Sequence, residues 1–393
     1  MNRRIYLDHA ATCFPKPSIV LDAMHSFSTS VEAAVGRGVY RSSQNSSEIV
    51  SRLRREIANW IDAKTAEEIS FHAGGTEAIN TALFGILRPG DHVVTTAVEH
   101  NSVLRPLHHL ADTKVINWTV VPADSHGHIS ADAILQAIQP HTRMIALVHA
   151  SNVNGAVQSI DTIGKRLVED FGESNKPIFL CDAAQTFGHL RLSVTDSHLD
   201  VLAAPGHKGG RGPLGTGFLY VRRELHCQIR PTVFGGTGTH SESLEMPREY
   251  PVSFEAGNMN VPALAGWLAG IRSRSQKSSA RAALKESSES MKTLATELYG
   301  RLREVRGVRV IGEPHELFLP VASIAIEGLP ASDAAMILDT EFGIEVRSGL
   351  HCAALIHEWI GSPPDGTLRI SCGESTTLQE LDCLADALKE ICE

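Results

Sequence analysis

The stretch Ala204–Gly210 has the sequence APGHKGG and contains Lys208. Upstream, the apolar run Ile178–Cys181 leads directly into Asp182. A lysine amine can bind an aldehyde covalently, and an aspartate can pair with a protonated ring nitrogen. These are the two groups that a protein supplies to pyridoxal 5'-phosphate (PLP), so the pair indicates a PLP site.

Strand-like and helix-like segments alternate around this pair, from about residue 50 to residue 235. Short apolar runs are separated by amphipathic stretches of helical period, a pattern typical of βαβ units and a mostly parallel sheet. The expected strands are 69–72, 92–96, 114–118, 144–148, 178–181 and 215–221, and two of the expected helices are 130–137 and 162–171.

The pattern changes after Pro262. Residues 275–305 are rich in Ala, Lys, Glu, Leu and Arg and predict a long helix that links two domains. The later segments predict a smaller α+β domain, with strands at 308–311, 321–326, 343–346 and 368–371 and helices at 332–342 and 377–391. For 393 residues, at roughly 100–200 residues per domain, we expect a large domain at 16–262 and a small domain at 263–393, with residues 1–15 nearby.

The composition excludes several classes of protein. Hydrophobic residues make up 42% of the chain and charged residues 21%, which suits a globular protein with a substantial core. The net charge of −9 and the absence of a basic cluster argue against a nucleic-acid partner. No apolar run approaches the roughly 20 residues that a bilayer span needs, so no membrane association is expected.

The seven cysteines are scattered and form no C-x-x-C pair. Their odd number and spacing argue against a disulfide framework and against a structural zinc site, so no metal is expected. Reduced thiols, together with a start that carries no apolar signal segment, predict a cytoplasmic protein.

Three turns that follow expected strands offer polar groups. The sequence GGTEA contains Gly75, Thr76 and Glu77 at the start of a helix, where free N–H groups favour a phosphate. His100 could stack on a flat ring, and Asn152 could donate to a ring oxygen. Each residue taken alone also fits an ordinary turn or a structural histidine. Open α/β sheets bind ligands at the carboxyl ends of their strands, where all three turns are expected.

These turns, followed by Asp182, Gln185, His207 and Lys208, occur in an order that resembles the PLP-dependent class V aminotransferase family, and most closely its cysteine desulfurases. The resemblance also includes YLDHAA at 6–11, FEAG at 254–257 and the segments around Cys352 and Arg369. It runs over almost the whole chain.

The resemblance implies fold type I of the PLP-dependent transferases. A large α/β domain with a seven-stranded, mostly parallel sheet would carry Lys208, and a smaller α+β C-terminal domain would carry Cys352 and Arg369. The site would lie between the domains, where ligand pockets commonly form. The resemblance also implies a homodimer.

The cofactor roles of the family fall on matching residues of this sequence. Lys208 would hold PLP, and Asp182 would keep its ring nitrogen protonated. Gln185 and Asn152 would hydrogen-bond the ring oxygen. His100 would stack on the ring and help to move protons.

The phosphate contacts include two departures from the family pattern. Thr76 and His207 would hold the phosphate, but Pro205 stands where the family usually has a serine, and proline offers neither N–H nor hydroxyl. Asn258 stands where many relatives carry a threonine that reaches the phosphate of the partner subunit. Thr237, in the sequence GTGT, is expected to compensate across the dimer interface.

The substrate side is assigned in the same way. Arg369 would clamp the substrate carboxylate with its bidentate fork, and Ala10 would lie over the site. Cys352 would attack the substrate sulfur as a thiolate, which the neighbouring Arg347 and His351 would favour. The alternative for Cys352 is a small buried hydrophobic residue.

Three functions remain open from the sequence. The first is a cysteine desulfurase that releases L-alanine and leaves a persulfide on Cys352 for a sulfur-acceptor protein, as in iron–sulfur cluster assembly. The second is a selenocysteine lyase, an aminotransferase or another PLP lyase in which Cys352 is not the nucleophile. Only residues 353–367 separate Cys352 from the strand of Arg369, which resembles a short-loop branch acting on cysteine or on selenocysteine. The third is a silent scaffold, which the retained Lys208 and Asp182 disfavour.

Overall fold

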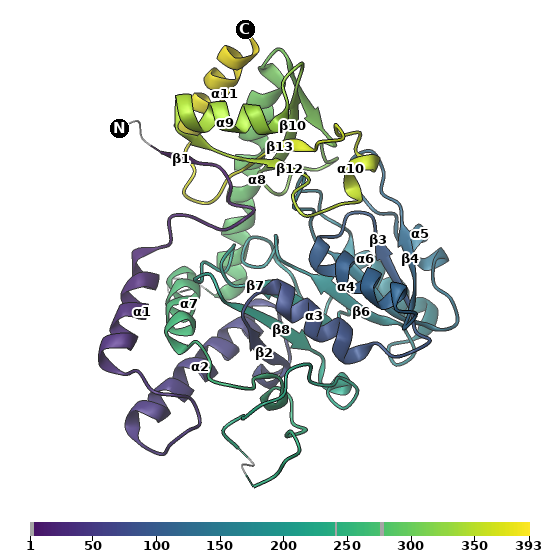
Figure 1. Ribbon diagram of the computed structural model, residues 1–393, viewed down its shortest axis with the longest axis vertical. Helices are drawn as coiled ribbons and strands as arrows, with labels where there is room; N and C mark the ends of the chain where they lie inside the picture. Colours follow the sequence, from purple (N-terminus) through teal and green to yellow (C-terminus); the bar gives the residue numbers. More distant parts are fainter. Residues whose placement is uncertain (1–3, 240–241, 276–278) are drawn as a thin grey trace.

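The computed structural model describes residues 4–239, 242–275 and 279–393. Two sheet-based bodies are stacked, and helix α8 (Ala280–Glu304) runs from the lower body to the upper one (Figure 1). We call them the large unit, which contains a seven-stranded sheet, and the small unit, which contains a four-stranded sheet. Within the described residues, no helix has both the length and the apolar character that a membrane crossing requires.

The sheet of the large unit has the strand order β2-β8-β7-β6-β5-β3-β4. Every neighbouring pair is parallel except the two that involve β8, so the predicted seven-stranded, mostly parallel sheet is confirmed. Its strands are β2 (Ile69–His72), β3 (His92–Thr96), β4 (Asn117–Val121), β5 (Thr142–Val148), β6 (Ile178–Asp182), β7 (Val201–Pro205) and β8 (Gly217–Val221).

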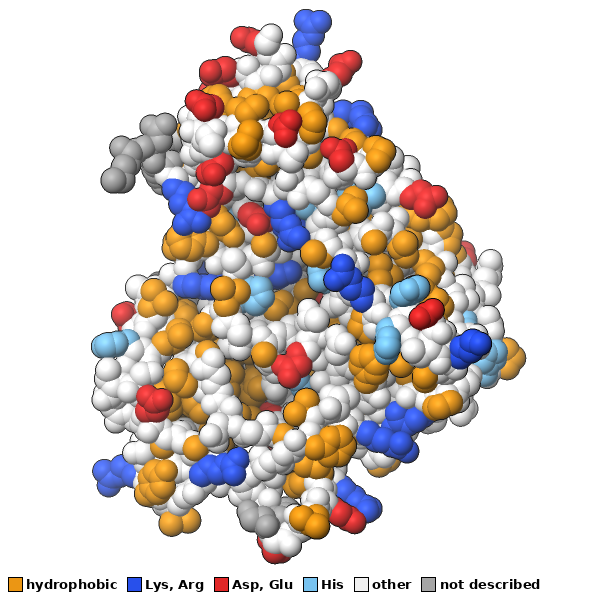
Figure 2. Space-filling model, viewed as in Figure 1, with side chains coloured by type: hydrophobic (Ala, Val, Ile, Leu, Met, Phe, Trp, Pro, Cys, Tyr) orange, Lys and Arg blue, Asp and Glu red, His pale blue; other side chains and the backbone are white. Residues whose placement is uncertain are grey.

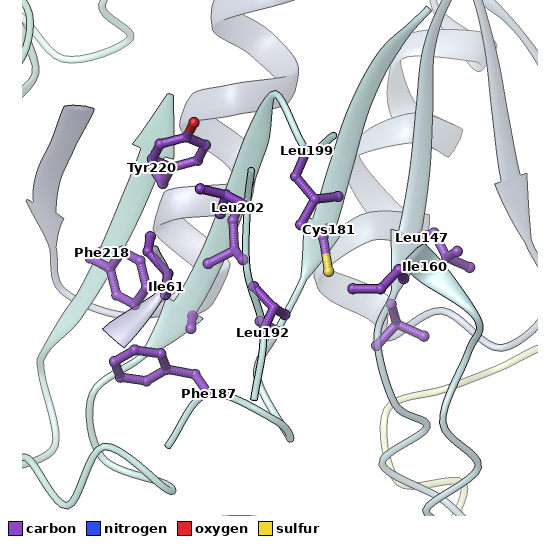
Figure 3. Packing of buried hydrophobic residues seen from close by; sticks show 14 of the residues in the cluster. Ile61, Leu147, Ile160, Cys181, Phe187, Leu192, Leu199, Leu202, Phe218 and Tyr220 are labelled. Carbon is purple, nitrogen blue, oxygen red and sulfur yellow. The ribbon is translucent and has the colours of Figure 1, made fainter. Parts of the chain in front are cut away.

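Helices cover both faces of this sheet. Successive residues of a strand point to opposite faces, so Phe179 and Cys181 join one hydrophobic cluster and Leu180 joins the other. Figure 3 shows Leu202 and Phe218 of neighbouring strands packed in the first cluster. That cluster includes residues of α2 (Arg41–Trp60), α5 (Ala131–Gln136), α6 (Ile160–Phe171) and α7 (Val261–Ser275), and the second includes residues of α3 (Gly75–Ile86) and α4 (Asn101–Asp112).

Helix α7 packs with the large unit although it lies almost wholly beyond residue 262. Trp267 is fully buried, and its ring lies 6.4 Å from that of Phe187 and 6.3 Å from that of Phe218. At Gly266 a Cβ would lie 2.6 Å from the Met24 side chain, so the glycine allows close approach to α1 (Ser18–Ser30).

One predicted strand is displaced. The apolar pattern predicts a strand at 114–118, whereas β4 begins three residues later, at Asn117. Lys114 has a φ of +59°, and its N–H donates to the carbonyl of Ala111. The N–H of Val115 donates to the carbonyl of Leu110. These residues therefore form the turn that ends α4, and the sheet starts after it.

The small unit carries an antiparallel sheet with the order β12-β13-β10-β9. The N-terminal strand β1 pairs in parallel with β11, which brings the start of the described chain to this unit. The elements are β1 (Ile5–Tyr6), β9 (Val308–Ile311), β10 (Val321–Ile326), α9 (Ala331–Phe342), β11 (Ile344–Glu345), β12 (Arg347–Gly349), α10 (Ile356–Trp359), β13 (Thr367–Ser371) and α11 (Leu378–Cys392).

Candidate active site

A cavity of about 230 Å³ lies where the carboxyl ends of the large sheet's strands meet the small sheet. Figure 2 shows Lys, Arg and His side chains gathered in a band across the middle of the molecule, between the two units. The cavity is lined by Ala10, Ala11, Gly75, Thr76, Ile79, His100, Ser102, Val148, Ala150, Asn152, Asp182, Ala184, Gln185, Pro205, His207, Lys208, Arg347 and Arg369. Most of the predicted site residues therefore meet in one place.

Lys208 and Asp182 come from neighbouring strands. Asp182 ends β6 and pairs in register with Ala203 of β7, and Lys208 lies three residues beyond the end of β7. Asp182 is 2% exposed, and burial raises its pKa, although the N–H of Ala184 donates to Oδ1 at 2.9 Å. Burial lowers the pKa of Lys208 to about 8, against the opposing effect of the Asp182 charge. A substantial fraction of the amine is therefore neutral and nucleophilic near pH 8.

His100 is the N-cap residue of α4. Its Nδ1 accepts the N–H of Ser102 at 3.0 Å, so the neutral ring carries its hydrogen on Nε2. Burial, with the charges of Lys208, Arg347 and Arg369, lowers the pKa of His100 to about 4. The imidazole is neutral at pH 7 and presents a flat face and one N–H donor.

The turn before α3 is the predicted phosphate cradle. The N-cap residue Gly74 makes no side-chain cap, so the first N–H groups of α3 have no side-chain acceptor there. A Cβ at Gly75 would lie 3.1 Å from the ring of Pro205, so glycine allows this turn to pack beside β7. Thr76 lines the cavity, whereas Glu77 does not; its Oε2 accepts the N–H of Ala73 at 2.5 Å. Glu77 thus holds the turn instead of facing the cavity.

His207 borders the same cavity. Its Nδ1 lies 3.1 Å from the hydroxyl of Thr12, and burial lowers its pKa to about 4. Gln185 is 7% exposed, and its Nε2 donates to the carbonyl of Ala10 at 3.1 Å. This contact places Ala10 over the cavity.

Arg369 is the buried cation of the cavity, with 1% exposure. Its Nη2 donates to Asp8 at 2.5 Å, and its Nη1 donates to the carbonyl of Asn152 at 3.0 Å. The Nε–H is buried and has no protein partner. A buried unpaired donor on a fixed guanidinium suits a carboxylate ligand.

Cys352 is exposed on the turn after β12, beside the cavity. Nη2 of Arg347 lies 3.2 Å from its Sγ. His351, which was expected to assist the thiolate, points elsewhere: its Nε2 lies 2.9 Å from the hydroxyl of Thr367. Burial lowers the pKa of His351 to about 2, so the ring is neutral. Arg347 is therefore the cation at the thiol, and His351 is not.

Thr237 and Asn258 lie away from this cavity within the chain. The hydroxyl of Thr237 lies 3.1 Å from that of Thr239 in a partly exposed loop. Asn258 lines a separate cavity of about 250 Å³ together with Glu77.

The sequence did not predict the contacts of two site residues. Asp8 was expected over the site, as part of the segment YLDHAA, but its pairing with Arg369 was not predicted. Ser102 fixes the His100 tautomer and also lowers the pKa of Asp182 through a hydrogen bond. Its position two residues after an N-cap was the available signal.

The residues present fit PLP. A half-buried amine just beyond one strand lies near a buried carboxyl group at the end of the adjacent strand. A neutral imidazole lies beside them, and an uncapped helix start with a hydroxyl lies at the cavity wall. These groups match an aldehyde, a ring nitrogen, a ring face and a phosphate respectively.

Comparison with known proteins agrees with this geometry. The model of the family "Aminotransferase class-V" matches residues 5–384. A probable cysteine desulfurase of Methanothermobacter thermautotrophicus is 33% identical, and the match covers 98% of this chain and 94% of that protein. The putative cysteine desulfurase IscS 1 of Bacillus subtilis is 31% identical, over 99% of this chain and 98% of that protein.

Solved structures agree as well. The apo cysteine desulfurase of Thermococcus onnurineus superimposes with a TM-score of 0.88 at 31% identity, covering 99% of this chain and 94% of that one. The cysteine desulfurase CsdA of Escherichia coli gives 0.85 at 26% identity, covering 98% and 94%. With the predicted fold in place, this chain belongs to the class-V aminotransferase family, among its cysteine desulfurases.

Proposed function

We propose that this protein is a PLP-dependent cysteine desulfurase that moves the sulfur of L-cysteine onto Cys352 and releases L-alanine. The observation that carries the assignment is the 3.2 Å contact between Arg347 and the exposed Sγ of Cys352, because Arg347 also lines the cavity of Lys208 and Arg369. An accessible sulfur next to a residue that lines the cavity lies within reach of a substrate bound there.

Substrate binding would use Arg369. The free Nε–H, with the remaining hydrogens of the guanidinium, would take the α-carboxylate of L-cysteine. Asp8 already accepts a hydrogen bond from Nη2 and the Asn152 carbonyl accepts one from Nη1, so the plane of the guanidinium is fixed before the substrate arrives. This preorganisation lowers the entropy lost on binding.

Bound PLP would supply an electron sink for the reacting carbons of the substrate. Lys208 would hold the cofactor through Nζ and, once freed, its neutral amine would take up and return protons at the substrate carbons. Asp182 is buried, and its charge raises the pKa of this lysine. Asp182 would hold a proton on the ring nitrogen. Neutral His100 would support the ring and donate through Nε2.

Sulfur transfer would then occur at Cys352. A bond forms between its Sγ and the substrate sulfur while the carbon–sulfur bond of the substrate breaks. The electron pair of that bond stays with carbon, which takes up a proton and becomes the methyl group of L-alanine. The thiol and the amino acid thus become a persulfide and alanine, with no external oxidant or reductant.

We also propose a two-domain division, a homodimer and a cytoplasmic location. The expected boundary after residue 262 is best moved beyond α7, because Trp267 lies in the core of the large unit. Thr237 and Asn258, which do not line the cavity of their own chain, would serve the site of the neighbouring subunit. All seven cysteines are unpaired, which suits a reducing compartment. The sulfur would pass to an acceptor protein, as in iron–sulfur cluster assembly.

The test is alanine and sulfide release from L-cysteine by the purified, PLP-loaded protein in the presence of a thiol reductant. Wild type should release both, and Cys352→Ala should release neither while still binding PLP. Cys227→Ala, which removes another exposed thiol, is the matched control and should behave as wild type. Full alanine release by Cys352→Ala would remove Cys352 as the nucleophile, and activity confined to selenocysteine would identify a lyase.

A further inference from the structure

The turn that carries Cys352 has an unusual backbone. His351 has a φ of +51° and Cys352 a φ of +59°, and Gly349 before them has a φ of +102°. A left-handed conformation is unfavourable for a residue other than glycine, so two such residues in succession need support from the surrounding structure.

The His351 imidazole is joined to the large unit by a chain of buried groups. Its Nε2 lies 2.9 Å from the Thr367 hydroxyl, which lies 2.9 Å from the Ser323 hydroxyl, which donates to the carbonyl of Val153 at 2.8 Å. Thr367, Ser323 and Val153 are 0% exposed, and His351 is 2% exposed. This series of hydrogen bonds starts at the turn that carries Cys352, passes through β13 and β10 of the small unit, and ends in the large unit.

The direction of these hydrogen bonds fixes the tautomer of His351. The Val153 carbonyl can only accept, so Ser323 donates its single hydroxyl hydrogen there and must accept from Thr367. Thr367 therefore accepts from His351, whose Nε2 must carry a hydrogen. The Thr367 carbonyl, 3.1 Å from Nε2, requires the same hydrogen. The other nitrogen, Nδ1, is buried and has no hydrogen-bond partner. Burying an unpaired lone pair of a neutral ring costs less than burying an unpaired N–H of a positively charged ring.

The large unit also holds the turn through hydrogen bonds to the carbonyls of His351 and Cys352. Nδ2 of Asn152 donates to the carbonyl of His351, and the backbone N–H of Asn101 donates to the carbonyl of Cys352, both at 2.7 Å. Asn101 follows His100 and Asn152 precedes Val153, so the groups that hold the turn adjoin the cofactor side of the cavity.

We propose that His351 is a positioning residue whose neutral Nε2–H, through Thr367 and Ser323, locks the left-handed turn that aims the Cys352 sulfur at Arg347 and the cavity. The inference rests on the proposed role of Cys352 as nucleophile. Because the chain crosses from one unit to the other, the aim of the sulfur depends on how the two units are packed.

Two variants of similar size at one position test this. His351→Gln keeps an N–H donor near the Nε2 position, and His351→Leu removes it. We expect His351→Leu to lower kcat for alanine formation by on the order of 10- to 100-fold with KM for L-cysteine nearly unchanged, and His351→Gln to recover most of the loss. Thr367→Val and Ser323→Ala, which interrupt the chain further along, should show the same split.

A second readout does not depend on turnover. Alkylation of Cys352 by iodoacetamide at pH 7, followed peptide by peptide in the full-length protein, reports whether the thiol still lies beside Arg347. We expect the rate to change several-fold in His351→Leu, Thr367→Val and Ser323→Ala, because the sulfur no longer keeps its place beside Arg347. Cys227, exposed and remote in sequence, is the internal control and should keep its rate.

Equal kcat and equal Cys352 alkylation in His351→Leu and His351→Gln would overturn the proposal. If His351→Leu does not fold, Thr367→Val and Ser323→Ala decide, and wild-type Cys352 alkylation in both would overturn it. If Cys352→Ala still makes alanine, the proposed function fails. The alkylation rates of Cys352 in the other variants still measure whether the chain of hydrogen bonds positions the sulfur.

Discussion

Lys208 lines the cavity from the large unit, and Cys352 lies beside the cavity residue Arg347 in the small unit. The structure holds these two residues by different means. On the cofactor side, Asp182 ends a central strand and Lys208 follows its neighbour, so the register of a parallel sheet sets their separation. In the small unit, Cys352 lies on a left-handed turn, and buried polar groups hold this turn through the neighbouring His351. Strand register thus sets the place of Lys208 and Asp182, whereas the place of the Cys352 sulfur depends on a turn and on the buried side chains that hold it.

The largest effect is expected from removal of the lysine. Lys208→Ala should lower alanine formation by at least about a thousandfold and abolish covalent PLP capture, since no other described residue lining the cavity has a primary amine. Borohydride reduction followed by peptide mapping measures the capture. Lys165→Ala, at an exposed position of α6, is the matched control and should leave both properties intact. Full capture by Lys208→Ala would refute the assignment.

The stability of the protein at acid pH is the next property to test, because the large unit also buries a histidine. His149 is 6% exposed, its Nδ1 lies 2.9 Å from the Thr186 hydroxyl, and burial lowers its pKa to about 4. Between pH 6.5 and 4 the unfolded chain binds a proton at this site that the folded protein does not. Stability should therefore fall as the pH drops through this window, by up to about 3 kcal/mol from this histidine alone.

Urea unfolding at pH 7 and pH 5 measures that loss. His149→Gln should reduce the difference between the two pH values, and His25→Gln, at an exposed position of α1, should not. An unchanged difference in His149→Gln would show that this imidazole does not titrate on unfolding.

A milder change separates binding from chemistry on the small-unit side. Arg369→Lys keeps a positive charge but loses the fork and the free Nε–H, so KM for L-cysteine should rise about tenfold with a smaller change in kcat. PLP should remain bound, unlike in Lys208→Ala. Arg309→Lys, on the exposed side of β9, is the control. A KM equal to that of wild type would place the carboxylate elsewhere.

The smallest effect concerns pH. Capture of PLP should speed up as the pH rises through about 8, because the Lys208 amine must lose its proton before it reacts. The charge of Asp182 raises the pKa of Lys208, so Asp182→Asn should move the midpoint of capture to lower pH. Absorbance on mixing with PLP follows the reaction. A midpoint that moves upward would contradict the electrostatic coupling of this pair.

Local pattern was enough to predict much of the fold. The strands β2, β3, β9 and β10 have the predicted bounds, because short apolar runs bounded by turns admit few alternatives. The strand predicted at 114–118 was displaced because Lys114 adopts a left-handed conformation in the turn after α4. Apolar runs do not show at which residue the turn that follows a helix ends.

The groups at the strand ends could be predicted from sequence. Asp182, Lys208, His100 and Asn152 follow apolar runs, and parallel strands bring such residues to one edge of the sheet. Folding in three dimensions settled which groups meet in space. It joined Asp8 to Arg369 and turned His351 away from the sulfur into a buried chain of hydrogen bonds, whereas Arg347 lies beside the Cys352 sulfur as their closeness in sequence predicted. The first two contacts depend on burial and on the meeting of distant segments, which a local sequence pattern does not show.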